Sequence, residues 1–266
     1  MTLTSMDTRC SSCNKRSNML CRLSRERSHL TGEHTNTGKP SKSMRNILAL
    51  SFLGLLLAAC NGTTAQLQPD QPATTLPKKF SLSVPFTVQA PFADWGDPYQ
   101  EACEEAALLI VHSYLAGNVL TKEQADRDLL ALIAWEEQQG FAQDITLTEV
   151  AEVAAAYYGY RAEVIQDPSI QEIQTQIALG NPVIVPAAGR MLGNPYFSGE
   201  GPWYHMLVIT GYDGKWFITN DPGTRRGEGY KYKHQILMEA IHDWTGVKEE
   251  IQEGKRVVMV VTGKSE

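Results

Sequence analysis

An apolar run near position 50 limits which part of this 266-residue chain can fold as a globular domain. The run covers residues 47–57, follows Met44 and Arg45, and contains no charged side chain. It has the length of a secretory hydrophobic region and falls well short of the roughly 20 residues that span a bilayer as a helix. The segment 61–79 after it is rich in Thr, Gln and Pro and has no apolar period, which is typical of a tether. The folded body is therefore expected over residues 80–266.

The apolar run ends in Leu-Ala-Ala-Cys, with the cysteine at Cys60. This pattern resembles the lipobox of bacterial lipoproteins, whose cysteine is diacylated and becomes the mature N-terminus. The resemblance implies a signal peptide over residues 44–59, and a lipidated Cys60 with a flexible linker over residues 60–79. It also implies a place in the bacterial cell envelope, outside the cytoplasm and anchored to a membrane. A buried core helix ending in cysteine is the alternative, but the run lacks the polar face of such a helix.

Residues 1–43 hold eight Lys and Arg against three Asp and Glu, and they lack apolar periodicity. Because secretory signals lie at an N-terminus, we expect translation to begin at Met44 and residues 1–43 to be a disordered extension from a mis-assigned start. A long basic region of the signal is the alternative. Cys10 and Cys13, near Cys21, have a loose zinc-ligand spacing, but no hydrophobic residues surround them to form a small core. We therefore expect no metal.

The body is acidic, with 13 Lys and Arg and 26 Asp and Glu over residues 80–266, a net charge of −13. This charge argues against a nucleic-acid partner, because phosphate contacts need clustered cations. Cys103 is the single cysteine of the body, which excludes a disulfide framework. Helical patterns fill its first half and strand patterns its second, which predicts an α+β fold. The expected helices cover about 100–116, 121–139, 148–158, 169–179 and 233–244, and the expected strands about 80–88, 161–165, 183–186, 204–212, 216–219 and 256–262.

Three residues of the body have the types and contexts of a nucleophile, a base and its orienting acid. Cys103 begins the first expected helix, where free amides and the helix dipole favour a thiolate. His205 begins an apolar strand, and Asp221 follows the next strand after the hairpin turn Asp213-Gly214. The hairpin brings the start of one strand near the end of the other, so Asp221 should reach the His205 ring. Taken singly, Cys103 also fits an inert buried cysteine and Asp221 a simple turn.

Gln89 precedes Cys103 by 14 residues in an extended, proline-containing segment. Its side-chain amide could donate to a developing oxyanion alongside the backbone N–H of Cys103. On its own, a glutamine in a loop carries no such meaning.

The contexts Gln89-Ala-Pro-Phe, Tyr-Gln-Glu-Ala-Cys103, Tyr-His205-Met-Leu-Val-Ile and Asn-Asp221-Pro together resemble the bacteriocin-leader-peptidase-like family of papain-fold cysteine peptidases. The resemblance covers the body from about Phe80 to the C-terminus. It implies a papain-like cysteine peptidase fold, with an N-terminal helical part carrying the Cys and an antiparallel sheet carrying the His and Asp. It also implies catalytic roles for these four residues, Gln89 included. No transporter segments accompany the body, so cleavage of a double-glycine leader during export is not implied.

One departure from the family concerns the residues after the nucleophile. Many members have Gly-Pro there, whereas this chain has Glu104 and Glu105. Carboxylates in a first helical turn suit the dipole, but they should also raise the pKa of the neighbouring thiol. More of the activation would then fall to His205.

The sequence thus predicts an extracytoplasmic, lipid-anchored cysteine peptidase that acts on a peptide or protein substrate through a Cys-His-Asp triad, without a cofactor. A cell-wall amidase or transpeptidase is an alternative with the same chemistry. A papain-fold lipoprotein that binds peptides or a partner without turnover is an alternative of another class.

The segment 189–202 before the expected base contains four Gly and two Pro, together with an unusual apolar load. Its length is near that at which loops tend to be functional. We expect it to fold over the cleft as a lid, with Tyr196, Phe197, Trp203 and Tyr204 contributing to substrate binding. The alternative is a surface loop whose aromatic side chains are buried in the core.

Overall fold

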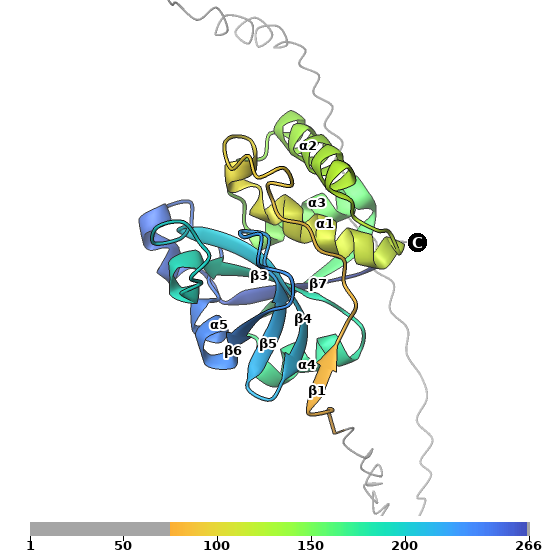
Figure 1. The fold of residues 1–266 in the computed structure, drawn as a ribbon, viewed down its shortest axis with the longest axis vertical. Helices are drawn as coiled ribbons and strands as arrows, with labels where there is room; N and C mark the ends of the chain where they lie inside the picture. Colours follow the sequence, from red (N-terminus) through yellow and green to blue (C-terminus); the bar gives the residue numbers. More distant parts are fainter. Residues whose placement is uncertain (1–74, 265–266) are drawn as a thin grey trace, which may run out of the picture. The chain divides into compact units, whose positions relative to one another are not determined.

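The computed structural model describes residues 75–264 (Figure 1). The expectations for residues 1–43, for the signal peptide at 44–59, for Cys60 and for the linker up to residue 74 lie outside this part of the chain. Within residues 75–264, no helix is both long and apolar enough to cross a membrane.

Three helices occupy the first half of the body, as predicted: α1 (Cys103–Ala116), α2 (Lys122–Gln139) and α3 (Leu147–Tyr158). Thr121 and Thr146 begin α2 and α3 as capping boxes, in which the threonine hydroxyl accepts from a backbone N–H three residues on and that residue's side chain accepts in return. A glycine in the left-handed conformation follows each of the three helices. A 3₁₀ turn, η1 (Tyr99–Glu101), leads into α1.

Seven strands form one antiparallel sheet in the order β2-β7-β3-β4-β5-β6, and β1 pairs with the far end of β4. The remaining helices connect these strands: α4 lies between β2 and β3, and α5 follows β6. The strand bounds are β1 (Lys79–Ser81), β2 (Tyr160–Gln166), β3 (Val183–Ala188), β4 (Tyr204–Asp213), β5 (Trp216–Asn220), β6 (Tyr230–Lys233) and β7 (Val257–Lys264). The other helical bounds are α4 (Ile170–Ala178), η2 (Gly189–Leu192), α5 (His234–Ala240) and η3 (Lys248–Glu253).

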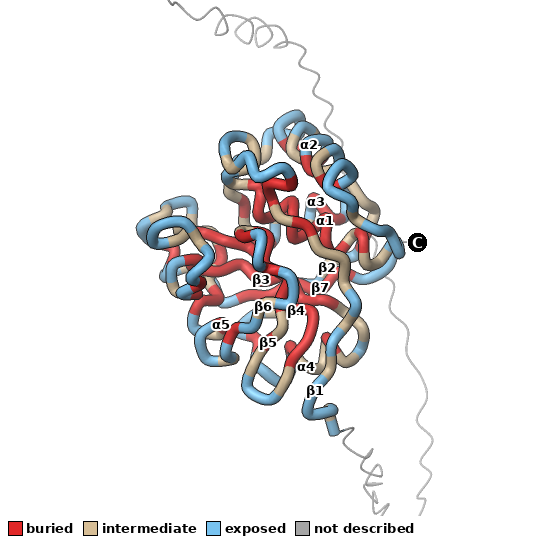
Figure 2. Tube along the Cα trace, viewed as in Figure 1, coloured by how far each residue is buried: buried red, intermediate tan, exposed pale blue. Residues whose placement is uncertain are grey.

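Helices cover the sheet on both faces (Figure 1). Alternate residues of the central strands enter two separate cores, since successive side chains of a strand point to opposite faces. Met206 and Val208 of β4 join the core shared with α1 and α3, whereas Leu207 and Ile209 join the core shared with α4 and α5. The central strands are therefore buried along most of their length (Figure 2). Mixed helix and antiparallel sheet confirm the predicted α+β class.

Three elements differ from the sequence-based expectation, and pairing partners explain each difference. The strand expected over 80–88 is limited to β1, because only Lys79–Ser81 pairs with β4. The helix expected to reach residue 244 ends at Ala240, because Ile241 forms an isolated bridge with Ala187. β6 was not expected, since its four residues form a strand only by pairing with β5.

Candidate active site

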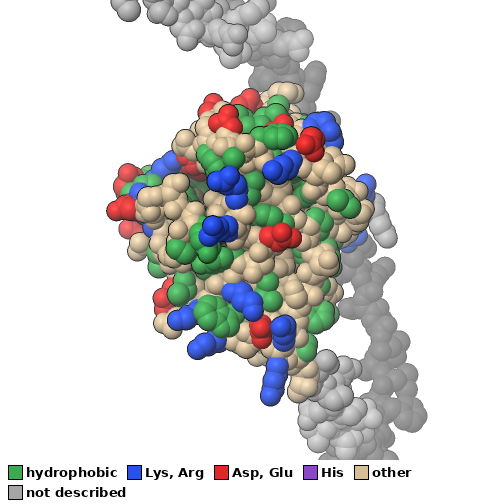
Figure 3. Space-filling view, viewed as in Figure 1, with side chains coloured by type: hydrophobic (Ala, Val, Ile, Leu, Met, Phe, Trp, Pro, Cys, Tyr) green, Lys and Arg blue, Asp and Glu red, His purple; other side chains and the backbone are tan. Residues whose placement is uncertain are grey.

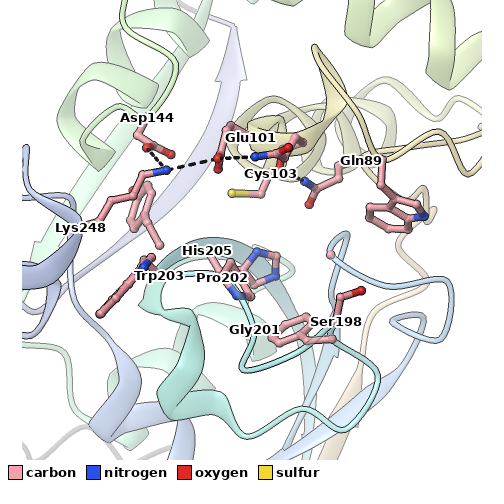
Figure 4. Close-up of a pocket in the computed structure, with 15 residues that line it drawn as sticks. Gln89, Glu101, Cys103, Asp144, Ser198, Gly201, Pro202, Trp203, His205 and Lys248 are labelled. Atoms are coloured by element: carbon pink, nitrogen blue, oxygen red, sulfur yellow. Dashed lines mark hydrogen bonds and ion pairs between the residues drawn. The ribbon is translucent and has the colours of Figure 1, made fainter.

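A cleft of about 420 Å³ contains both Cys103 and His205. Cys103 is the first residue of α1 and is buried, with 5% of its surface exposed. His205 is the second residue of β4 and is also buried. The two side chains project into the cleft from opposite walls, Cys103 from the helical side and His205 from the sheet side (Figure 4).

The hairpin of β4 and β5 brings Asp221 to His205, as the sequence predicted. Asn220, the last residue of β5, pairs with Val208, so the next residue reaches the start of β4. His205 Nε2 lies 2.7 Å from Asp221 Oδ1. Because Nε2 is engaged by the carboxylate, Nδ1 is the ring nitrogen left for the cleft. This arrangement fixes the tautomer and the orientation that a general base requires.

Asp221 is itself held by three further donors. Its Oδ2 accepts from the Tyr232 hydroxyl at 2.6 Å and from Asn194 Nδ2 at 3.1 Å, and its Oδ1 accepts from the backbone N–H of Gly223 at 3.0 Å. Full burial favours a raised pKa for Asp221, but the charge and hydrogen bond of His205, together with these donors, leave the pKa below its ordinary value. Asp221 is therefore the ionised partner of His205.

Sequence reasoning missed both Asn194 and Tyr232. Asn194 lies in an irregular loop 27 residues before Asp221, and Tyr232 lies in the unexpected strand β6. Neither position carries a local signal, because Asn194 reaches Asp221 through the packing of its loop and Tyr232 through the pairing of β5 with β6.

The thiol of Cys103 is hydrogen-bonded to a carboxyl group rather than to the imidazole. Its Sγ donates to Glu104 Oε2 at 3.0 Å, and Glu104 Oε1 accepts from the backbone N–H of Ile145 at 3.3 Å. Burial raises the pKa of the Cys103 thiol well above its usual value, and the carboxyl groups of Glu104 and Glu105 raise it further. The direction of the pKa effect predicted for the two glutamates is thus confirmed, and Cys103 is a protonated thiol in this arrangement.

Gln89 lines the same cleft but uses its amide group on the backbone. Its Nε2 donates to the carbonyl oxygens of Tyr99 and Gln100, both at 2.9 Å. These carbonyls belong to η1, the turn that leads into Cys103, so Gln89 holds that turn in place. Donation to an oxyanion would require one of these two hydrogen bonds to be exchanged.

The residues predicted to bind substrate all lie at the cleft or beside it. Phe197, Trp203 and Tyr204 line the cleft, and Tyr196 lines an adjoining hollow. Phe197 packs edge-on against the His205 ring, with the ring centroids 5.2 Å apart. Tyr204 is buried and donates its hydroxyl to the carbonyl of Ile145, so most of its ring belongs to the core.

An ion-pair network lies at one end of the cleft (Figure 4). Lys248 of η3 lies 3.2 Å from Glu101 and 3.8 Å from Asp144, and these contacts join three segments that are distant in the sequence (Figure 4). Ser198 lies at the other end in the same view. In the part of the chain that the structure describes, no cluster of His, Cys, Asp and Glu side chains is arranged to hold a metal ion.

A cysteine at the start of a helix facing a histidine–aspartate pair on an antiparallel sheet is the arrangement of a papain-like α+β protein. A model of the Peptidase_C39-like family matches residues 81–258. The chain therefore belongs to the Peptidase_C39-like family, which supports a peptidase of the cysteine type.

A crystal structure of a Bacillus anthracis protein classed as a C39-like peptidase has 16% sequence identity and a TM-score of 0.48. The match covers 71% of the present chain and 99% of the other. No curated protein matches the chain.

Proposed function

We propose that this protein is an extracytoplasmic, lipid-anchored cysteine peptidase that hydrolyses peptide bonds with Cys103, His205 and Asp221. The observation that carries the proposal is the 2.7 Å contact of His205 with Asp221, in a cleft whose opposite wall supplies Cys103. Family membership supports the same chemistry.

In the proposed reaction, Nδ1 of His205 takes the thiol proton and Sγ of Cys103 bonds to the substrate carbonyl carbon. The oxyanion is held by the backbone N–H of Cys103, which as the first helical residue has no partner within the helix. The side-chain amide of Gln89 becomes a second donor to the oxyanion after it gives up one of its hydrogen bonds to the carbonyl oxygens of Tyr99 and Gln100. The C–N bond then breaks, and the imidazolium protonates the leaving amine. Water, deprotonated by His205, attacks the thioester and frees the thiol.

This cycle requires the thiol to leave its resting partner. Cys103 Sγ must turn from Glu104 Oε2 toward the imidazole before the proton can move. Substrate binding in the cleft would supply the displacement. The buried, protonated thiol is also the one observation that favours the alternative of a peptide-binding protein without turnover.

Substitution of the triad separates these two functions. Cys103→Ala and His205→Ala should each remove nearly all cleavage, and the double variant should be little worse than either, because the pair acts as a unit. Asp221→Asn should leave weak activity, with the melting temperature as a check on folding. A protein that binds peptides equally well in all variants and cleaves none of them would establish the non-catalytic alternative.

The anchor is a separate part of the proposal and has its own test. Cys60 follows a lipobox-like sequence, so Cys60→Ser should release the protein from the membrane fraction to the soluble fraction. Intact mass should show a mature protein that begins at a diacylated Cys60 and lacks residues 1–43 and the signal peptide 44–59. A variant that stays membrane-bound, or a mature protein that retains those residues, would overturn the anchor and leave the peptidase proposal standing.

A further inference from the structure

A second hollow, of about 240 Å³, adjoins the catalytic cleft. The two cavities share Trp95, Ser198 and Gly223 in their linings, so a bound chain could pass from one to the other. The lining of the second hollow contains two guanidinium groups, Arg225 and Arg226, and no carboxylate. The catalytic cleft differs in this respect, since Glu101 and Asp144 line it.

Neither guanidinium is neutralised by a side chain of residues 75–264. Arg225 and Arg226 are exposed, and neither forms an ion pair with a described residue. Lys248, at one end of the catalytic cleft, is by contrast paired with two carboxylates. Two unpaired cations that line one hollow repel each other, and an anion bound in that hollow would relieve the repulsion.

The loop that carries the two arginines is closed on itself. The backbone N–H of Asp221 donates to the carbonyl of Gly227, and the N–H of Gly227 donates to the carbonyl of Thr224, both at 3.1 Å. The N–H of Arg226 donates to the Thr224 hydroxyl at 3.3 Å. A Cβ at Gly227 would overlap the carbonyl oxygen of Asp221, so this closure requires glycine.

The same loop also contacts the catalytic base. It begins at Asp221, which orients His205, and an added Cβ at Gly223 would come within 2.7 Å of His205 Cε1. Arg225 follows two residues later. The guanidinium groups therefore start from a backbone that is fixed relative to the imidazole, which lowers the conformational entropy lost on binding a ligand.

An aromatic surface supports one of the two cations. The guanidinium carbon of Arg226 lies 4.7 Å from the ring centroid of Tyr196. That ring packs edge-on against Tyr230, and Tyr230 packs against Tyr232, whose hydroxyl donates to Asp221. Stacking of this kind leaves the N–H edge of a guanidinium free to bind a carboxylate in a bidentate manner.

The second hollow is lined by basic side chains, although the body as a whole is acidic. Residues 80–266 carry a net charge of −13, yet basic side chains lie among hydrophobic ones on the face shown in Figure 3. The acidic charge of the body as a whole would repel an acidic substrate. A local pair of unpaired arginines beside the cleft would counter that repulsion and attract an acidic group of the substrate.

We propose that Arg225 and Arg226 form a subsite for a carboxylate of the peptide substrate, and that this subsite favours acidic substrates. The inference rests on the proposed peptidase function and assigns that site its substrate class. Two sources supply such a group: an Asp or Glu side chain at a fixed distance from the cleaved bond, or the carboxylate at the end of a short peptide.

The full-length protein can be tested with two series of synthetic peptides. In the first, both ends are blocked and a single Glu is moved along an otherwise neutral peptide, with Gln at the same place as its control. In the second, neutral peptides carry either a free or an amidated C-terminus. We expect one position of Glu, or the free C-terminus, to raise kcat/KM about five- to tenfold, chiefly through KM and less at high salt.

Arginine substitutions then assign the effect. Arg225→Gln and Arg226→Gln should each reduce the preference, and the double variant should abolish it while cleavage of neutral peptides is kept. Arg161→Gln is the matched control, because Arg161 is exposed on β2, at the opposite edge of the sheet from the β5–β6 loop. The subsite is excluded if no carboxylate is preferred, or if the preference survives in the double variant.

A binding measurement distinguishes failure of the subsite from failure of the catalytic proposal. Fluorescence anisotropy of the labelled Glu and Gln peptides on the Cys103→Ala protein reports binding without chemistry. Arginine-dependent binding of the Glu peptide with no cleavage by the unsubstituted protein would refute the peptidase and support the subsite. Cleavage of both peptides by the unsubstituted protein, with equal binding of the two peptides to Cys103→Ala, would support the peptidase and refute the subsite.

Discussion

Cys103 and Glu104 are adjacent in the first turn of α1, and their contact sets the resting state of the site. Position at a helix start favours the thiolate, whereas burial and the neighbouring carboxyl group favour the thiol. The balance lies with the thiol, because the pKa of Cys103 is raised well above its usual value. A reactive thiolate would then form only when His205 accepts the proton, and a thiol that stays protonated at rest is less open to oxidation.

Replacement of Glu104 tests this balance directly. Glu104→Gln removes the nearest carboxyl group and should lower the pKa of the Cys103 thiol, although burial still holds that pKa above its usual value. The measurement is the pH dependence of Cys103 alkylation by iodoacetamide. Glu123→Gln, in the first turn of α2, is the matched control and should leave the profile unchanged. An unaltered or upward-shifted profile in Glu104→Gln would contradict this role.

At the scale of elements, local signals predicted the ends of the capped helices well and the extent of the strands poorly. Thr121, Gly117 and Gly140 act through hydrogen bonds and backbone angles within a few residues, so the sequence alone reveals them. β1 pairs with a partner distant in the chain, and β6 is a four-residue edge strand joined to β5 by a nine-residue loop without a hairpin signal, so the sequence misplaced the first and missed the second.

The same distinction applies to the candidate site. The proximity of His205 and Asp221 was predictable because a single hairpin produces it. The thiol–carboxyl contact of Cys103 was foreseen only as a pKa effect, not as a hydrogen bond. The Asn194 and Tyr232 contacts to Asp221 were not foreseen, since the first needs the packing of the loop after η2 and the second needs the register of β5 with β6.

The loop 189–202 divides into parts with different roles. Phe197 is half-buried against the sheet core and the His205 ring, whereas Tyr196 is 43% exposed. Phe197→Ala should therefore lower both the melting temperature and kcat, with a loss of stability of about 1–3 kcal/mol. Tyr196→Ala should raise KM for acidic peptides and change stability by less than about 0.5 kcal/mol. Steady-state kinetics and thermal melts check both variants. The same changes in stability and kinetics in Phe197→Ala and Tyr196→Ala would contradict the assignment of different roles to the two residues.

At the scale of the whole molecule, buried carboxyl groups join α1 to α2. Glu105 of α1 and Glu136 of α2 are both buried, and each carboxyl group affects the pKa of the other. Burial is the main cause that raises the pKa of Glu105 to about 7 and that of Glu136 to about 10, from an ordinary value of 4.5. Between pH 4.5 and these values the folded state binds more protons than the unfolded state, so stability must fall as the pH rises.

Chemical denaturation across pH measures this effect. The free energy of unfolding should decrease from about pH 5 upward, by at most about 1.4 kcal/mol per pH unit for each proton involved. Glu136→Gln keeps a hydrogen-bonding group without the charge and should flatten this dependence. Glu137→Gln, its exposed neighbour, should leave the slope as it is. A slope that is equally steep in Glu136→Gln would show that other groups carry the pH dependence.

The peptidase proposal is tested most directly by the products of a mixed-peptide digest. The full-length protein and its Cys103→Ala variant are incubated with the same peptide mixture, and mass spectrometry identifies every new terminus. We predict internal cleavage products from the unsubstituted protein and none from Cys103→Ala at equal melting temperature. The same products at the same rate from Cys103→Ala, or none from the unsubstituted protein, would contradict it.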